Sequence, residues 1–188
     1  MIALCGLSSF MGCAQDIAPT DNENNMVIDT TPNTIVVDAT SKEDWIYFDL
    51  DQSLDTPSTE MAIPGWDIAF QRFRVKSNNG VSGNEGVEVG IVEDMAYEEV
   101  ESTPENIMFF IDQEDSDDYG SDPDYVFNMG DQWYDYDLMT HTLKPRDTVY
   151  IIRSTEDQYF KILILDYYNE VGDSAFLKIK LQQILPPQ

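Results

Sequence analysis

Short β-branched and aromatic runs, separated by turn residues, are the feature that most constrains the fold of this chain. Two of them are Thr34–Ala39 and Trp45–Leu50, each bounded by polar residues. Similar runs start roughly every 10–20 residues, at 66–76, 87–92, 106–111, 125–128, 132–137, 148–153, 158–167 and 174–182. Turn signals stand between them, at Asn79-Gly80, Gly83, Gly120, Gly130 and Gly172-Asp173. No segment sustains a 3.6-residue apolar period, so we predict an all-β fold.

The last three runs predict consecutive antiparallel strands. A polar Ser-Thr-Glu-Asp-Gln connection joins 148–153 to 158–167, which indicates a hairpin. Gly172-Asp173 then joins 158–167 to 174–182 as a second hairpin.

In the run 66–76 the alternation of apolar and polar residues changes phase partway along. Its even positions are apolar up to Phe70 and cationic afterwards, while the odd positions change in the opposite direction. Because a strand with one buried face cannot change parity without an irregularity, we predict a β-bulge near Gln71. Arg72, Arg74 and Lys76 would then project from one face, either as an anion-binding stripe or as simple charge balance.

Composition excludes several classes of function. The 188 residues contain 36 Asp and Glu against 10 Lys and Arg, for a net charge of −26, which argues against nucleic acid and against a polybasic membrane contact. His141 is the only histidine of the chain, so no site that needs two imidazoles can form. No Gly-x-Ser-x-Gly or phosphate-loop motif is present, and we expect no enzymatic activity.

The N-terminus resembles a secretory signal peptide. Residues 1–12 are apolar or small, without the usual cationic start, and we interpret them as a truncated signal peptide. Gly12-Cys13 resembles a bacterial lipobox, which makes Cys13 the expected lipid attachment site; a Cys5–Cys13 disulfide or two buried thiols are the alternatives. Residues 13–33 would be a polar tether and 34–188 a single domain.

The acidic stretch 112–124 offers seven carboxylates. An exposed acidic loop is one interpretation, and a calcium site is the alternative because hard cations prefer several carboxylates on a flexible loop. The helix–loop–helix calcium template does not fit, since Tyr119 and Val126 fall at ligand positions.

Several of these pieces, taken in order, resemble the HmuY family of haem-binding outer-membrane lipoproteins. The matching pieces are Trp45-Ile46-Tyr47-Phe48, Trp66-Asp67-Ile68-Ala69-Phe70 with Arg72, Asn78 to Gly83, Trp133-Tyr134, His141 to Pro145, Tyr150 to Arg153, Tyr159 to Ile162 and Tyr167-Tyr168. They cover roughly residues 40–180, nearly the whole predicted domain.

The resemblance implies a single all-β domain of HmuY type that holds haem between two strand-connecting loops through axial side chains. The family's ligand after the Trp-containing strand corresponds to Leu138 or Met139 here. Because some members use methionine, Met139 is the first candidate for iron, His141 the second, and Met129 or Met108 candidates for the opposite face. A core-filling methionine and a hydrogen-bonded histidine are the alternatives.

Haem also needs partners for its propionates. The candidates are the stripe of Arg72 and Arg74, or Lys144 with Arg146 beside the ligand loop. The resemblance further implies a lipid anchor in the outer membrane and handover of haem to an outer-membrane receptor, with a host haem protein as the alternative partner. A non-haem adhesion or interaction module on the same fold, steadied by calcium, is the competing hypothesis.

Overall fold

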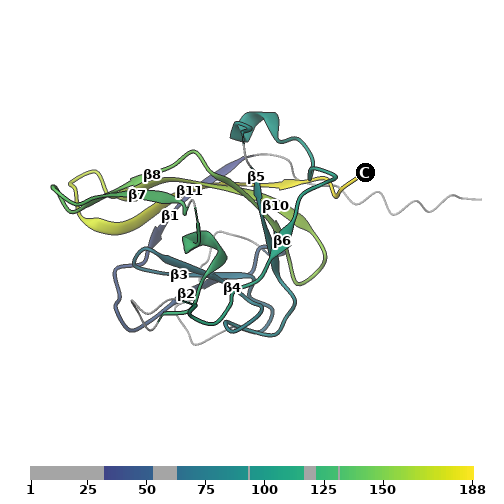
Figure 1. Cartoon of the computed structure of the whole chain (residues 1–188), viewed down its shortest axis with the longest axis horizontal. Coiled ribbons are helices and arrows are strands. Elements are labelled where there is room, and N and C mark those ends of the chain that lie inside the picture. Colours follow the sequence, from purple (N-terminus) through teal and green to yellow (C-terminus); the bar gives the residue numbers. More distant parts are fainter. Residues whose placement is uncertain (1–31, 53–62, 93, 117–121, 131) are drawn as a thin grey trace, which may run out of the picture.

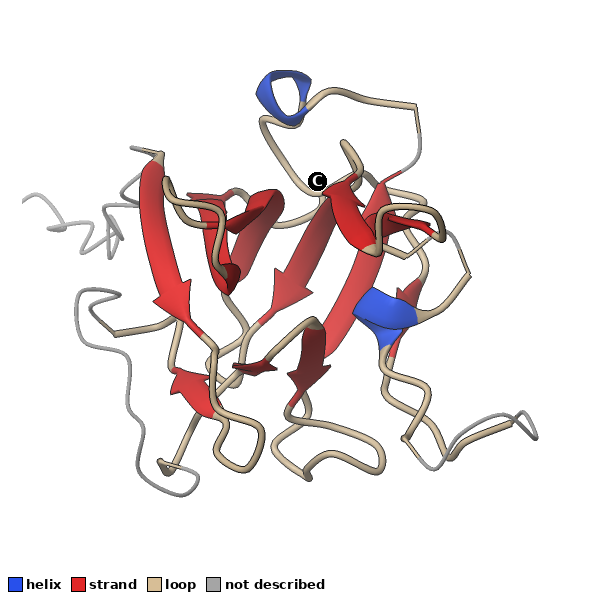
Figure 2. Cartoon of the chain, turned by 90° about the vertical axis from the view of Figure 1, so that its left-hand side faces the viewer, coloured by secondary structure: helices blue, strands red, loops and turns tan. Residues whose placement is uncertain are grey.

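The computed structural model describes residues 32–52, 63–92, 94–116, 122–130 and 132–188. The predicted signal peptide, Cys13 and nearly all of the predicted tether lie outside these residues, as does the middle of the acidic stretch. The described chain consists of antiparallel strands and two short 3-10 turns, η1 (Tyr97–Glu99) and η2 (Val126–Asn128), so the predicted all-β class is confirmed (Figure 2). Within the described residues, no helix has the length and apolarity to cross a bilayer.

A six-stranded sheet forms the larger layer (Figure 1). Its spatial order is β1 (Asn33–Asp38), β11 (Ser174–Ile184), β10 (Tyr159–Tyr168), β9 (Val149–Arg153), β5 (Glu88–Val92) and β6 (Phe109–Phe110). Both predicted C-terminal hairpins are confirmed, because β10 pairs antiparallel with β9 and with β11.

The sheet is buried on both faces at β9, whose first four residues are inaccessible. Tyr150 and Ile152 face the main core, and Val149 and Ile151 face a smaller cluster with Tyr97 of η1. A strand covered on both sides needs no polar alternation, which explains its continuous apolar sequence.

The smaller layer is the three-stranded sheet of β2 (Ile46–Phe48), β3 (Ile68–Gln71) and β4 (Arg74–Ser77), which lies below the large sheet in Figure 1. The bulge predicted near Gln71 is wrong, because Gln71 pairs with Arg74 across a two-residue turn. Arg72 opens that turn with φ 55° and donates its N–H to Ala39 O (2.8 Å). The chain reverses there, so the change of parity marks two strands rather than one irregular strand.

A separate ribbon, β7 (Tyr134–Asp137) with β8 (Thr142–Pro145), reaches to the left in Figure 1 alongside the β10–β11 hairpin. Leu143 N donates to Tyr168 Oη of β10 (2.9 Å). At the base of the ribbon the buried Trp133 donates its indole N–H to Phe73 O (3.1 Å).

The side chain of Asp112 links the small sheet to η2 through hydrogen bonds in the protein interior. Its buried carboxylate accepts hydrogen bonds from Ser77 N (2.8 Å) and Val126 N (3.0 Å). Gly80, at φ 61°, approaches so closely that a Cβ there would overlap the carbonyl oxygen of Asp112. The strand predicted at 125–128 is therefore wrong; the segment is the 3-10 turn η2, held by this carboxylate rather than by a neighbouring strand.

Candidate functional site

A cleft of about 860 Å³ opens between the end of β5, the edge strand β6 and the segment that follows η2. Its lining is mainly apolar and comprises Ile91, Val92, Asp94, Met95, Ala96, Phe110, Val126, Met129, Gly130, Asp147 and Thr148. The volume lies within the range of small-molecule sites, which are concave and mostly apolar.

Two methionines from different parts of the chain line this cleft. Met129 is the C-cap of η2, and its N–H bonds Val126 O (3.4 Å). Met95 belongs to the loop between β5 and η1 and is 39% exposed. Thioether sulfur is a soft ligand that suits iron in haem, so these side chains can supply axial ligands.

Met129 was among the candidates predicted from the sequence, whereas Met95 was not. They lie 34 residues apart in the sequence; Met95 follows β5 of the large sheet, whereas Met129 is positioned by η2 and its hydrogen bond to Asp112. Nothing in the sequence around Met95 marks it, because a methionine next to an aspartate fits an ordinary exposed loop.

The charged side chains that line the cleft are Asp94 and Asp147. Asp94 is held in the left-handed region at φ 59°, directly before Met95. Among the described lining residues there is no lysine, arginine or histidine. The cleft therefore combines an apolar wall, two thioethers and negative charge.

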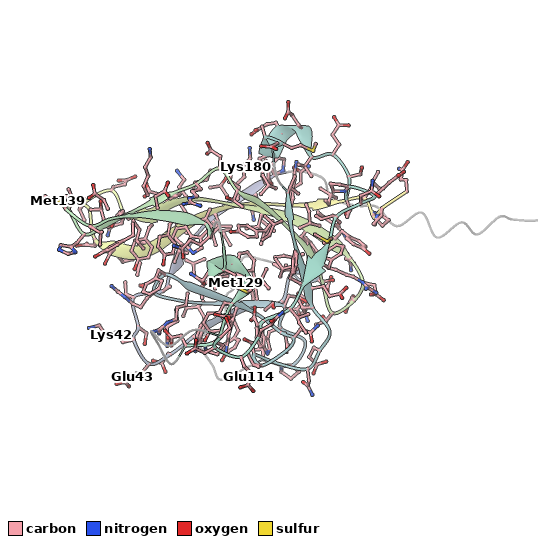
Figure 3. All side chains as sticks on the ribbon, in the orientation of Figure 1. Lys42, Glu43, Glu114, Met129, Met139 and Lys180 are labelled. Carbon is pink, nitrogen blue, oxygen red and sulfur yellow. The ribbon has the colours of Figure 1, made fainter. Side chains whose placement is uncertain are left out.

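The first two predicted iron ligands lie elsewhere, in the turn between β7 and β8. Figure 3 shows Met139 at the tip of this ribbon, away from Met129. Met139 is 90% exposed, and its N–H bonds the Asp137 carboxylate (2.7 Å). His141 is exposed at φ 56°, with its Nδ1 2.6 Å from Tyr136 Oη. This contact leaves Nε2 as the ring nitrogen for a ligand, but neither side chain lines the cleft.

The predicted propionate partners do not line the cleft either. Arg72 donates to Thr40 O (3.2 Å) and Ser174 Oγ (3.1 Å). Arg74 pairs with Asp122 (2.6 Å), and Arg146 pairs with Asp135 (2.5 Å). Lys144 is exposed on β8.

Lys76 shares one face of β4 with Arg74, whereas Arg72 lies in the turn before the strand, so the predicted stripe forms only in part. The Nζ of Lys76 lies over three aromatic rings, at 4.3 Å from the centroid of Trp45, 5.1 Å from Tyr47 and 5.2 Å from Trp66. Desolvation by these rings lowers the pKa of Lys76.

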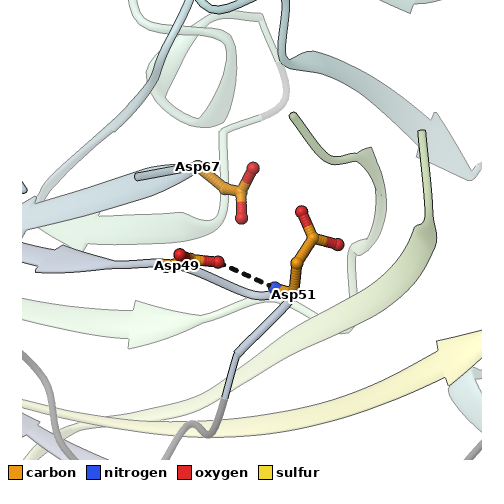
Figure 4. Close-up of side chains that lie close together, drawn as sticks. All are labelled: Asp49, Asp51 and Asp67. Carbon is orange, nitrogen blue, oxygen red and sulfur yellow. Dashed lines mark hydrogen bonds between the residues drawn. The ribbon is translucent and has the colours of Figure 1, made fainter. Parts of the chain in front are cut away.

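A cluster of three carboxylates lies apart from the cleft, where Asp49, Asp51 and Asp67 present oxygens within 4.8 Å of one another (Figure 4). Asp67 is fully buried and accepts hydrogen bonds from Leu50 N (2.6 Å) and Thr155 N (2.7 Å). Burial raises the pKa of Asp67 to about 7.

Asp51 extends this network to the β9–β10 turn. Its carboxylate accepts hydrogen bonds from Ser154 Oγ (2.6 Å) and Glu156 N (3.1 Å). The cluster is thus a structural junction that holds this turn against the loop after β2.

The described ends of the acidic stretch give no support to calcium. Asp112 binds two backbone N–H groups, and Asp124 accepts from Ser116 Oγ (2.6 Å) and Ser116 N (3.2 Å). Gln113 and Asp124 form an antiparallel bridge that closes the stretch at its base. These groups already have partners within the protein.

Fold and cleft together define a small antiparallel all-β domain with a methionine-lined cleft beside a sheet edge. The family model described as "HmuY protein" matches residues 41–180, and the chain belongs to this family. The predicted family resemblance is therefore confirmed.

Solved structures with the same fold come from several bacteria. An apo HmuY analog from Tannerella forsythia superposes with a TM-score of 0.61 at 15% identity, covering 82% of this chain and 96% of that one. A protein from Bacteroides vulgatus, assigned as an HmuY-like heme binding protein, gives 0.57 at 18% identity, with coverages of 81% and 92%. A Bacteroides fragilis protein assigned as a lipoprotein gives 0.57 at 19% identity, with coverages of 81% and 91%. At such identities the likeness shows the fold alone.

A comparison with curated protein sequences finds no match to the chain.

Proposed function

We propose that this protein is a lipoprotein of the cell envelope that binds haem or a related porphyrin without catalysing a reaction. The observation that carries the proposal is the apolar cleft with Met95 and Met129 in its lining. Membership of the HmuY family and the B. vulgatus relative assigned as heme binding support it. Capture at the cell surface, through a lipid on Cys13 in the outer membrane, and handover to an outer-membrane receptor complete the proposed role.

The chemical types of the side chains that line the cleft suit haem. Iron in haem accepts thioether sulfur, and the porphyrin plane needs apolar walls, which Ile91, Val92 and Phe110 provide. Met129 is the stronger of the two ligand candidates because η2 and Asp112 fix its backbone. Met95, on a more exposed loop, would be the second residue able to offer a thioether to the iron.

The ribbon tip provides the alternative iron site, with Met139 or His141 as ligand. Arg146 and Lys144 at the ribbon would then be the nearest propionate partners, and Arg72 and Arg74 the remoter ones. The tip lacks the enclosing apolar walls of the cleft, since Leu138 is 76% and Met139 90% exposed. We therefore place the porphyrin in the cleft.

A haemin titration of the full chain, followed by visible absorption in the oxidised and reduced states, tests the proposal. We expect a saturable one-to-one complex whose affinity falls about tenfold or more in Met129→Ala, because loss of an axial ligand removes a bond to iron. Met95→Ala should change the spectrum through the second axial position.

Met108→Ala is the matched control, since Met108 is 71% exposed and does not line the cleft. A spectral change in Met139→Ala or His141→Ala, with Met129→Ala unaffected, would move the iron to the ribbon tip. If haemin gives no saturable spectrum, the proposal fails and an interaction module on the same fold becomes the better hypothesis.

A further inference from the structure

The charges of the cleft conflict with those of free haem, which carries two propionates. Asp94 and Asp147 line the cleft from two separate segments, the loop after β5 and the connection before β9. Both are exposed and carry negative charge at neutral pH, and the described lining contains no cation to offset them. A propionate that entered the cleft would therefore meet only like charge.

Three cations next to the lining segments, either in the sequence or through contacts with the η1 segment, have other partners. Arg146, next to Asp147, pairs with Asp135. Lys161 lies behind the η1 segment and donates to Tyr97 O (2.7 Å) and Val100 O (2.8 Å). Lys180 pairs with Glu98 (2.6 Å), also on the η1 segment.

We propose that Asp94 and Asp147 are specificity residues that select the ligand of the cleft by charge: they exclude the propionate edge of a porphyrin, so that its apolar edge enters, and they favour porphyrins without free carboxylates. The inference rests on the proposed function, since it concerns the same cleft. Its physical basis is that a propionate inside the cleft would lie within a Debye length of both carboxylates, so that their repulsion acts on it although both side chains are exposed.

The test compares haemin with its dimethyl ester, which has the same ring and iron but no propionate charge. We expect the ester to bind the full chain more tightly than haemin at low salt. Asp94→Asn and Asp147→Asn should each strengthen haemin binding by about threefold to tenfold and leave the ester within about twofold. Salt near the physiological level should reduce this difference.

A matched control distinguishes the effect of charge in the cleft on haemin affinity from the effect of the net charge of the protein. Glu43→Gln removes one negative charge at an exposed position far from Met129 (Figure 3), and it should leave haemin affinity unchanged. If haemin binds but the Asp94 and Asp147 variants match Glu43→Gln, the specificity inference is overturned while the proposed function stands. If neither porphyrin binds, the proposed function fails, and this inference fails with it.

Discussion

The buried carboxyl of Asp67 gives stability a pH dependence opposite to that of an ion-paired carboxylate. Burial raises its pKa to about 7, against the pull of hydrogen bonds from Thr155 N and Leu50 N, and Asp51 and Asp49 add to the rise. In the unfolded chain an aspartate has a pKa of about 3.9. Between these two values the native state binds more protons than the unfolded state, so stability falls as pH rises through the window.

We expect this one group to lower the free energy of unfolding by about 3 kcal/mol between pH 5 and pH 8, since about two pH units separate pH 5 from the native pKa. Urea titrations across this range measure it. Asp67→Asn does not titrate, and its amide N–H₂ faces one of the two backbone donors, so the variant should be less stable than the parent at pH 5. Its stability should also change less with pH.

General repulsion among the 36 acidic residues also grows with pH, so the comparison needs a control. Glu43→Gln, at an exposed position, should keep the slope of the parent protein. An Asp67→Asn variant with the parent slope would assign the pH dependence to overall charge instead.

At the scale of elements, the sequence predicts those strands whose apolar runs and connecting turns can be recognised from neighbouring residues alone. β9, β10 and β11 follow one another through local turns, and Gly172-Asp173 marks the second turn. The turn between β3 and β4 has no such marker, because Arg72 adopts φ 55° with support from Ala39 O, a partner over 30 residues away in the sequence. A single sequence does not show that contact, so the same change of parity fits a bulge as well as a turn.

A hydrogen bond from outside its own strands ties the β7–β8 ribbon to the large sheet. Leu143 N donates to Tyr168 Oη of β10, and the side chains of Tyr134 and Leu143 also pack against the main core. Tyr168→Phe should cost about 0.5–1.5 kcal/mol of global stability, since it removes one hydrogen bond at a half-buried position. Amide hydrogen exchange should accelerate most at Leu143 and along the ribbon, and in β9 and β11 only by the amount that the loss of global stability requires.

Tyr136→Phe provides the control for this prediction. It removes a hydroxyl at the ribbon tip that contacts only the exposed His141. It should leave the exchange of Leu143 as in the parent. Equal protection of Leu143 in Tyr168→Phe would show that strand pairing within the ribbon is sufficient to hold it.

At the scale of the whole molecule, the candidate site depends on contacts between distant segments, which a single sequence does not show. The cleft joins segments that are distant in sequence, and the sheet order β10-β9-β5-β6 determines which loops meet there. Met129 could be named from the sequence because the family resemblance implies methionine ligands, although Met139 and His141 ranked before it. Asp94, Met95 and Asp147 could not, because their relevance arises only when β5 pairs with β9.

The net charge of −26 should govern how fast a dianionic porphyrin reaches the protein. At low ionic strength of about 0.01 M the Debye length is about 30 Å, comparable to the whole domain, and it falls to about 8 Å near 0.15 M. We therefore expect the association rate constant of haemin, measured by stopped-flow absorption, to rise severalfold over this range. The dimethyl ester, which lacks the propionate charges, should show little change.

A rate that falls with added salt would have the opposite meaning. It would require a local cationic face that outweighs the overall charge and attracts the propionates, and Arg72, Arg74, Lys144 and Arg146 are the candidates for it. Arg146→Gln would then slow association at low salt, whereas in a cleft guarded by Asp94 and Asp147 the same change should have little effect, because Arg146 is paired with Asp135. The sign of the salt dependence thus distinguishes entry at the cleft from capture at the ribbon.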